Sequence, residues 1–213
     1  MTSVGRIVLL LFFALWSAGL GRSAGAQIIG TVTGLAGTAS LQRPAAATPV
    51  PLVLRSEVQE GDILRTGPGA RIRVTLRDDT VLLLGAEAEL KLDHFATVPQ
   101  PGGVGSLFSL ARGYLRTVVG RLQPDTPFQI QSPSMVAAVR GTDWIERYDA
   151  GTTEIFVVNG RVLATGLADR DTNWAMLTAG EGVSFVIRAP HTPVVRWGRK
   201  RSTGSSKPPA CPE

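Results

Sequence analysis

The sequence predicts an all-β fold built from short, mostly antiparallel strands. Apolar residues make up 44% of the chain, and 24 glycines and 14 prolines fit many strands joined by tight turns. Apolar and polar residues alternate with a period of two, most clearly from Arg71 to Leu76. Turn signals recur roughly every 8–12 residues, as in sandwiches and barrels. We therefore expect one domain, folded as a sandwich or a roll.

Residues 1–26 have the features of a signal peptide. Arg6 precedes an uncharged apolar run, and Ala24-Gly25-Ala26 has the small-x-small form of a cleavage site. The alternative is an uncleaved anchor, but the stretch ends at Arg22 and is shorter than the ~20 apolar residues that span a bilayer. We expect cleavage after Ala26, a periplasmic or secreted protein, and no stable membrane anchor afterwards.

The positive charge lies at the two ends of the chain. The net charge is +5, of which the leader carries two charges and residues 191–213 carry a net of +4, which leaves −1 on residues 27–190. A nucleic-acid-binding domain would carry a basic face, so we expect no nucleic acid partner. Residues 191–213 predict a basic, disordered tail that could contact anionic lipid or cell-wall polymer.

The first half of the predicted domain contains the clearest strands. Two short β-like runs lie within residues 28–42, and the proline-rich residues 44–51 predict a loop. The alternating strand 71–76 is followed by a turn at Asp78-Asp79 and a returning strand over residues 80–84. Residues 88–92 also alternate, although their short Ala-Glu run leaves a helix open.

The second half continues the same pattern. We expect a pair of strands at 107–110 and 114–119, then strands at 128–131, 135–139, 144–148, 153–158 and 183–187, with a short one at 176–177. Asn159-Gly160 lies between two apolar runs, which is the strongest short-range signal for a β-hairpin with a type I′ turn.

Several of these segments, taken in order, resemble the FecR-domain family. The motifs are Val58-x-x-Gly61-Asp62-x-Leu64-x-Thr66-Gly67, Val74-x-Leu76-x-Asp78-x-Thr80-x-Leu82-x-Leu84-Gly85, Leu110-x-x-Gly113-x-Leu115-Arg116, Phe128-x-Ile130-x-x-Pro133 with Val139-Arg140-Gly141-Thr142, and Thr153-x-x-Phe156-Val157-x-x-Gly160-x-Val162. The motifs themselves lie between residues 58 and 162, and we expect the resemblance to cover residues 27–187. The resemblance implies a single FecR-like β domain over residues 27–190.

The chain departs from the family pattern in two places. Relatives that regulate iron transport carry a cytoplasmic region that contacts a sigma factor, and only a few residues precede the apolar run here. We therefore expect the periplasmic domain without the cytoplasmic anti-sigma region. Asp79 stands where the family commonly has glycine, which makes a type I′ turn less assured, although aspartate tolerates left-handed φ at some cost.

The sequence offers little for catalysis. Neither His94 nor His191 lies in a recognisable catalytic motif, and no Gly-x-Ser-x-Gly, Walker or HExxH pattern is present. The available acids, Asp62, Asp78, Asp79 and Asp143, are mostly explained as turn residues. We expect no enzymatic activity, no cofactor and no metal.

Arg140 and Trp144 form the candidate recognition surface, because arginine and tryptophan are enriched in binding hot spots. Alternation places both side chains on one face unless a bulge at Gly141 intervenes. The competing interpretation is structural, with Gly141 forming a bulge and Arg140 pairing with a nearby acid. The predicted structural turn residues are Gly61, Asp62, Gly67, Asp78, Asp79, Gly141, Asn159 and Gly160.

These observations favour an exported, non-catalytic binding or scaffold module whose partner is another envelope protein or a cell-wall polymer. Binding of an added strand at a sheet edge is a plausible mode. Two alternatives remain: a sensory relay that couples an outer-membrane receptor to a separate regulator, and cell-wall or polysaccharide binding.

Overall fold

The structure is a computed structural model that describes residues 27–96, 105–120 and 127–196. The predicted signal peptide, residues 1–26, lies outside the described residues. The described chain is all-β, as predicted, and its elements are strands joined by turns and loops. None of the described segments forms a helix with the length and apolar character needed to cross a membrane.

The first half of the chain contributes strands on both sides of a common core. They are β1 (Ile28–Ala36), β2 (Ala39–Gln42), β3 (Val50–Pro51), β4 (Glu57–Gln59), β5 (Ile63–Thr66), β6 (Arg71–Leu76), β7 (Val81–Leu84), β8 (Glu89–His94) and β9 (Ser106–Val118). The second half contributes β10 (Phe128–Gln131), β11 (Met135–Val139), β12 (Asp143–Asp149), β13 (Thr152–Asn159), β14 (Arg161–Gly166), β15 (Trp174–Thr178), β16 (Glu181–Val186) and β17 (Val195–Arg196).

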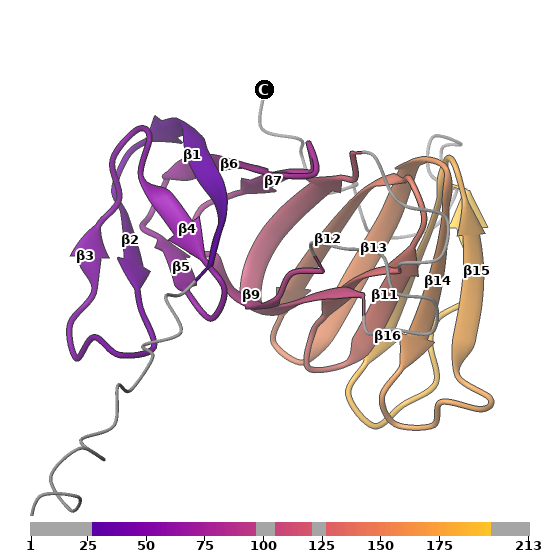
Figure 1. The fold of residues 1–213 in the computed structure, drawn as a ribbon. Helices are drawn as coiled ribbons and strands as arrows, with labels where there is room; N and C mark the ends of the chain where they lie inside the picture. The colour runs from indigo at the N-terminus through magenta and orange to yellow at the C-terminus, as the bar shows by residue number, and fades with distance from the viewer. Residues whose placement is uncertain (1–26, 97–104, 121–126, 197–213) are drawn as a thin grey trace, which may run out of the picture.

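These strands form two sheets that run the length of the domain. Sheet A has the order β4-β1-β6-β7-β9-β12-β13-β16-β17. Sheet B has the order β3-β2-β5-β8-β9-β10-β11-β14-β15. Every pairing is antiparallel except that between β9 and β10. Figure 1 shows the N-terminal strands as one lobe, the C-terminal strands as the other, and β9 between them.

Strand β9 belongs to both sheets. Its first part pairs with β8 and β10 in sheet B, and its second part pairs with β7 and β12 in sheet A. The change of sheet occurs at Gly113, which has a φ of +84°. A Cβ atom there would lie 2.5 Å from the Cα of Ala88. Glycine is therefore required both for the backbone conformation and for the close approach.

The core lies between the two sheets and is formed by the inward-facing half of each strand. Strand β6 shows the rule, because Ile72, Val74 and Leu76 are buried while Arg71 and Arg73 are exposed. An aromatic group occupies the C-terminal half, where the Phe108 and Phe128 rings meet edge to face with centroids 5.3 Å apart. Such pairs add to the gain from burying apolar area.

Two expectations about connections are wrong. The predicted pair of strands at 107–110 and 114–119 is the single strand β9. Asn159-Gly160 does not close a hairpin, because β13 pairs with β12 and β16, whereas β14 pairs with β11 and β15. Gly160 has a φ of +90° and Asn159 has no positive φ. The dipeptide carries the chain from sheet A to sheet B, and a type I′ turn is not formed.

The other predicted turn residues occupy tight connections. Gly61 has a φ of +86°, and Asp79 has a φ of +65° in the turn between β6 and β7. The carboxylate of Asp78 accepts hydrogen bonds from the Thr80 backbone N–H and hydroxyl, each at 2.9 Å. Gly67 keeps a negative φ, but a Cβ there would lie 2.6 Å from the Thr38 hydroxyl.

Asp62 is a buried turn residue. One carboxylate oxygen accepts a hydrogen bond from the backbone N–H of Gln59 at 2.8 Å, which closes the turn between β4 and β5. Burial raises the pKa of the Asp62 carboxyl, while this hydrogen bond and the charge of Arg43 oppose the rise.

Six residues of the expected C-terminal tail, 191–196, are part of the fold. The Thr192 N–H donates to the Ser184 carbonyl at 2.9 Å, and β17 pairs with β16 through Glu181–Arg196 and Gly182–Val195. The folded domain therefore continues past Pro190 to Arg196. Residues 197–213 lie outside the described residues.

The requirement for glycine at the bend of β9 can be tested by Gly113→Ala. Left-handed φ costs alanine about 1–2 kcal/mol, and the clash with Ala88 adds about 1–3 kcal/mol. Gly69→Ala is the matched control, since Gly69 has a φ of +67° and open space around it. Denaturant unfolding should show a distinctly larger loss for Gly113→Ala. Equal losses would mean that the close approach of β9 to Ala88 is unimportant.

Candidate recognition surface

Trp144 is not part of a surface, and the expectation that it shares one with Arg140 is wrong. The Trp144 side chain has 0% exposure and meets the Phe128 ring edge-on, with centroids 6.2 Å apart. Gly141 has a φ of +66°, and the pairing of β12 with β13 shifts register between Asp143 and Trp144. The extra residue of this shift is Val158 on β13. The chain changes from β11 of sheet B to β12 of sheet A across Gly141, so alternation does not carry over, and Trp144 turns into the core while Arg140 stays exposed.

Arg140 lines a groove on the outer face of sheet B. The groove has a volume of about 720 Å³, and its lining includes Arg140, Arg161, Leu163 and Met176. It lies over the ends of β11, β14 and β15. A concave site with an apolar floor and a few charged groups is typical of binding sites.

The groove continues into an exposed apolar face at the edge of sheet B. Leu163, Trp174 and Met176 are 38%, 52% and 50% exposed. Met176 lies opposite Leu163 on the neighbouring strand, and Leu163 lies opposite Ala138 on the next. Single exposed apolar residues are ordinary, but neighbours in one cross-strand row form a contiguous patch.

Sequence reasoning missed most of this patch. It placed a strand only at residues 176–177, whereas β15 begins at Trp174 and alternates exposed and buried through Trp174, Ala175, Met176, Leu177 and Thr178. That alternation was the available signal. It predicts a strand without showing that the apolar Trp174 and Met176 take the outward positions.

The two sheets end differently at this side of the molecule. In sheet A, residues 192–196 run along β16 and pair with it. In sheet B, β15 pairs with β14, and no described strand pairs with its other edge. Strand β15 itself contains no proline and no charged residue, which are the usual devices that protect an edge strand. The Glu181 carboxylate accepts hydrogen bonds from the Thr178 N–H and hydroxyl, each at 2.8 Å, and so caps one end of this edge. Among the described residues, the edge is open at residues 174–177.

A second exposed apolar group lies in the N-terminal half. Val50, Val53 and Leu54 are 50%, 60% and 57% exposed at and after β3. Strand β3 has only two residues and ends in Pro51, which lacks a backbone donor. This group therefore offers a poorer template for strand addition than β15 does.

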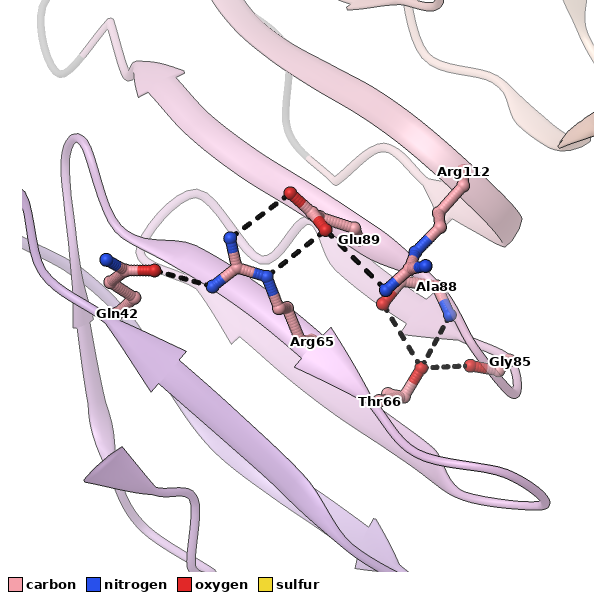
Figure 2. A network of polar contacts seen from close by, with 7 residues as sticks. All are labelled: Gln42, Arg65, Thr66, Gly85, Ala88, Glu89 and Arg112. Carbon is pink, nitrogen blue, oxygen red and sulfur yellow. Dashed lines mark hydrogen bonds and ion pairs between the residues drawn. The ribbon is translucent and has the colours of Figure 1, made fainter. Parts of the chain in front are cut away.

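In the N-terminal half of sheet B, charged side chains on the outer face pair with one another (Figure 2). Arg65 on β5 lies opposite Glu89 on β8, and Glu89 lies opposite Arg112 on β9. The Arg65 guanidinium contacts the Glu89 carboxylate at 3.1 and 3.3 Å and the Gln42 amide oxygen at 2.7 Å. Arg112 approaches the same carboxylate at 3.8 Å. One acid thus serves two arginines on neighbouring strands.

Beneath this network lies a buried hydroxyl. The Thr66 Oγ1 donates to the Gly85 carbonyl at 2.6 Å and accepts from the Ala88 N–H at 2.8 Å (Figure 2). These bonds hold the chain between β7 and β8 against β5. The N-terminal half of sheet B is therefore fixed by its own polar contacts.

A carboxyl group is buried at the centre of sheet A. Glu146 on β12 has 0% exposure and lies opposite Leu115 and Ile155, both also fully buried. Neither carboxyl oxygen has a hydrogen-bond partner. Burial raises the pKa of Glu146 to about 8. The nearby Trp144 indole opposes part of this rise, although its N–H and the carboxyl oxygens do not meet the geometry of a hydrogen bond. The carboxyl is mainly protonated at neutral pH.

The described residues contain no group of three or more His, Cys, Asp or Glu side chains placed to hold a metal ion. His94 contacts Glu60 at 3.3 Å on the surface of the N-terminal half. Asp143 binds Arg116 through two contacts at 3.0 and 2.8 Å. The acids that the sequence offered for chemistry thus lie in separate turns and ion pairs.

The described chain is thus a two-sheet β fold with an exposed apolar patch at one edge of sheet B. Residues 62–163 match the family model described as FecR protein. The match is shorter than the 27–187 range suggested by the motifs. No curated protein matches the chain.

Two solved structures share the fold. Both come from Parabacteroides distasonis, at 2.50 and 1.65 Å resolution, and both are described as a "putative anti-sigma factor". They superpose with TM-scores of 0.50 and 0.51 at 18% sequence identity and cover 62% of this chain. The alignment spans 57% of the length of those chains.

The buried Glu146 predicts a pH-dependent stability. The folded protein keeps a proton up to pH about 8 that the unfolded chain releases near the ordinary pKa of 4.5. The contribution of Glu146 to the unfolding free energy should therefore be full below pH 4.5 and fall by about 1.4 kcal/mol per pH unit between pH 4.5 and pH 8. Glu146→Gln should flatten this slope in denaturant titrations, while Glu154→Gln, on the opposite face of β13, should keep it. A slope unchanged by Glu146→Gln would contradict the assignment.

Proposed function

We propose that this protein is an exported, non-catalytic binding module of the bacterial envelope. It docks a partner protein on the outer face and open edge of sheet B, centred on β15. The observation that carries this proposal is the combination of an unpaired edge strand with the exposed Trp174 and Met176 on the same strand. Backbone N–H and C=O groups along the edge provide affinity, and the apolar face provides specificity.

The surrounding structure supports binding rather than chemistry. Trp174 and Met176 stand on a strand whose inward-facing residues, Ala175 and Leu177, are buried in the core. A rigid platform of this kind positions apolar side chains for a partner at little entropic cost. The FecR-family match and the shared fold of the structures from Parabacteroides distasonis agree with a regulatory rather than an enzymatic role.

Site-specific crosslinking in the native envelope tests the docking site. A photoreactive residue at position 176 should yield one discrete partner adduct, whereas the same residue at position 53, equally exposed but in the N-terminal half, should not. Trp174→Ser should abolish the adduct without loss of fold, because the indole is half exposed. The same adduct tests export, because cleavage of the signal peptide after Ala26 would make Gln27 its N-terminal residue. An adduct from position 53 alone would place the site elsewhere.

A second candidate is a sensory relay to a separate regulator. It is favoured by the fold shared with structures described as anti-sigma factors. On this hypothesis the partner at β15 belongs to a signalling system, so deletion of the gene should change envelope-stress or iron-responsive transcription. Unchanged transcription in the deletion strain, together with a crosslinked adduct in the strain that makes the protein, would exclude the relay and leave the binding module standing.

A further inference from the structure

Two arginines stand at one end of the groove on the outer face of sheet B. Arg140 follows Val139 at the end of β11, and Arg161 precedes Val162 on β14, while Val139 and Val162 lie opposite each other. The two arginines therefore come next to each other at the end of this antiparallel pairing. Both are exposed and line the groove. Like charges in such positions repel each other, and an anion that contacts both would relieve the repulsion.

Two acids lie near this pair in the chain or across the strands, and both bind other groups. Asp143, shortly after Arg140, contacts the Arg116 guanidinium at 3.0 and 2.8 Å. Glu181, at the start of β16, accepts hydrogen bonds from the Thr178 N–H and hydroxyl, each at 2.8 Å. Within the described part of the chain, neither guanidinium of the groove forms an ion pair or a side-chain hydrogen bond.

The backbone that carries the two arginines is held by contacts around it. The Thr142 hydroxyl donates to the Arg161 carbonyl at 2.8 Å and ties the connection after β11 to the start of β14. The Thr142 carbonyl accepts from the Val119 N–H at 3.0 Å. A Cβ at Gly160 would lie 2.9 Å from the Thr142 hydroxyl oxygen, so the two connections pack closely. The guanidinium groups thus start from fixed points of the sheet, and a preformed site loses little entropy on binding.

The remaining lining of the groove is mostly apolar. Leu163 on β14 lies opposite Met176 on β15 and opposite Ala138 on β11, and Pro127 lies beside them in the lining. The volume of about 720 Å³ lies in the range of sites for small molecules. A ligand that fills this groove therefore meets positive charge at one end and apolar side chains along the rest.

We propose that the groove binds a small amphipathic anion with a carboxylate or phosphate head and an apolar body. The head contacts Arg140 and Arg161, because guanidinium groups donate in the fork geometry that both oxyanions accept. The body covers Leu163 and Met176. This inference goes beyond the docking of a partner protein, since it assigns a ligand to the inner strands β11 and β14 and needs no strand added at the β15 edge.

Isothermal titration calorimetry of the purified protein with octanoate, octyl phosphate and octanol tests the charged end of the site. At least one of the two anions should bind about tenfold more tightly than octanol. The Arg140→Gln, Arg161→Gln double variant should lose this preference and should unfold at no lower denaturant concentration, because it removes a repulsion. The matched control Arg73→Gln, Arg112→Gln changes the net charge equally at two exposed positions outside the groove and should keep the preference.

The apolar end is tested by Leu163→Asn at a partly exposed position. This variant should reduce the preference for octanoate over butanoate about tenfold, because fewer methylene groups are buried. Its thermal midpoint reports whether the fold is kept, and Met176→Gln provides a second variant on the neighbouring strand if it is not.

Several results would overturn the inference and leave the docking at β15 standing. They are the absence of binding by both anions, equally tight binding of octanol, and an anion preference that survives the double variant of the groove or falls equally in the control. If that double variant instead abolished the adduct formed from position 176 and left anion binding unchanged, the two arginines would serve the partner protein. That result would also overturn the inference.

Discussion

The shared strand β9 is the constraint on which the rest of the structure depends. Strand β9 pairs first in sheet B and then in sheet A, and so joins the two ladders of strands that enclose the core. The change of sheet requires a backbone conformation that only glycine adopts cheaply, at a point where Ala88 leaves no room for a Cβ. Loss of this bend would separate the ladders.

Each of the two sheets has an end strand in the C-terminal half of the domain, and these two ends differ. The end of sheet A is covered by residues 192–196, whereas the end of sheet B is the bare strand β15. Natural proteins usually protect an edge with charge, proline or a bulge, because an exposed edge invites association. Strand β15 has no proline or charged residue of its own, which is why the proposed binding site is centred on it. Its inner side chains are anchored in the core, so the outer ones are held in place.

The two halves of the outer face of sheet B differ in how their charged side chains are paired. In the N-terminal half, Glu89 contacts two arginines and ties three strands together. In the C-terminal half, Arg140 and Arg161 stand beside an apolar groove. The buried Glu146 lies on the inner side of sheet A and belongs to the core. The stabilising contacts of Glu89 and the proposed binding site thus lie in different halves of the outer face of sheet B.

The sequence by itself determined the all-β class and the strands whose inside-outside pattern is local. The strand 71–76 and the turn at Asp78-Asp79 could be read directly, because period-two alternation and turn chemistry depend on neighbouring residues alone. Only the tertiary structure decided which strands pair. It joined 107–110 and 114–119 into β9, made Asn159-Gly160 a crossing between sheets, turned Trp144 inward and left Trp174 exposed. Those outcomes depend on register and on which sheet a strand enters, and partners distant in sequence set both.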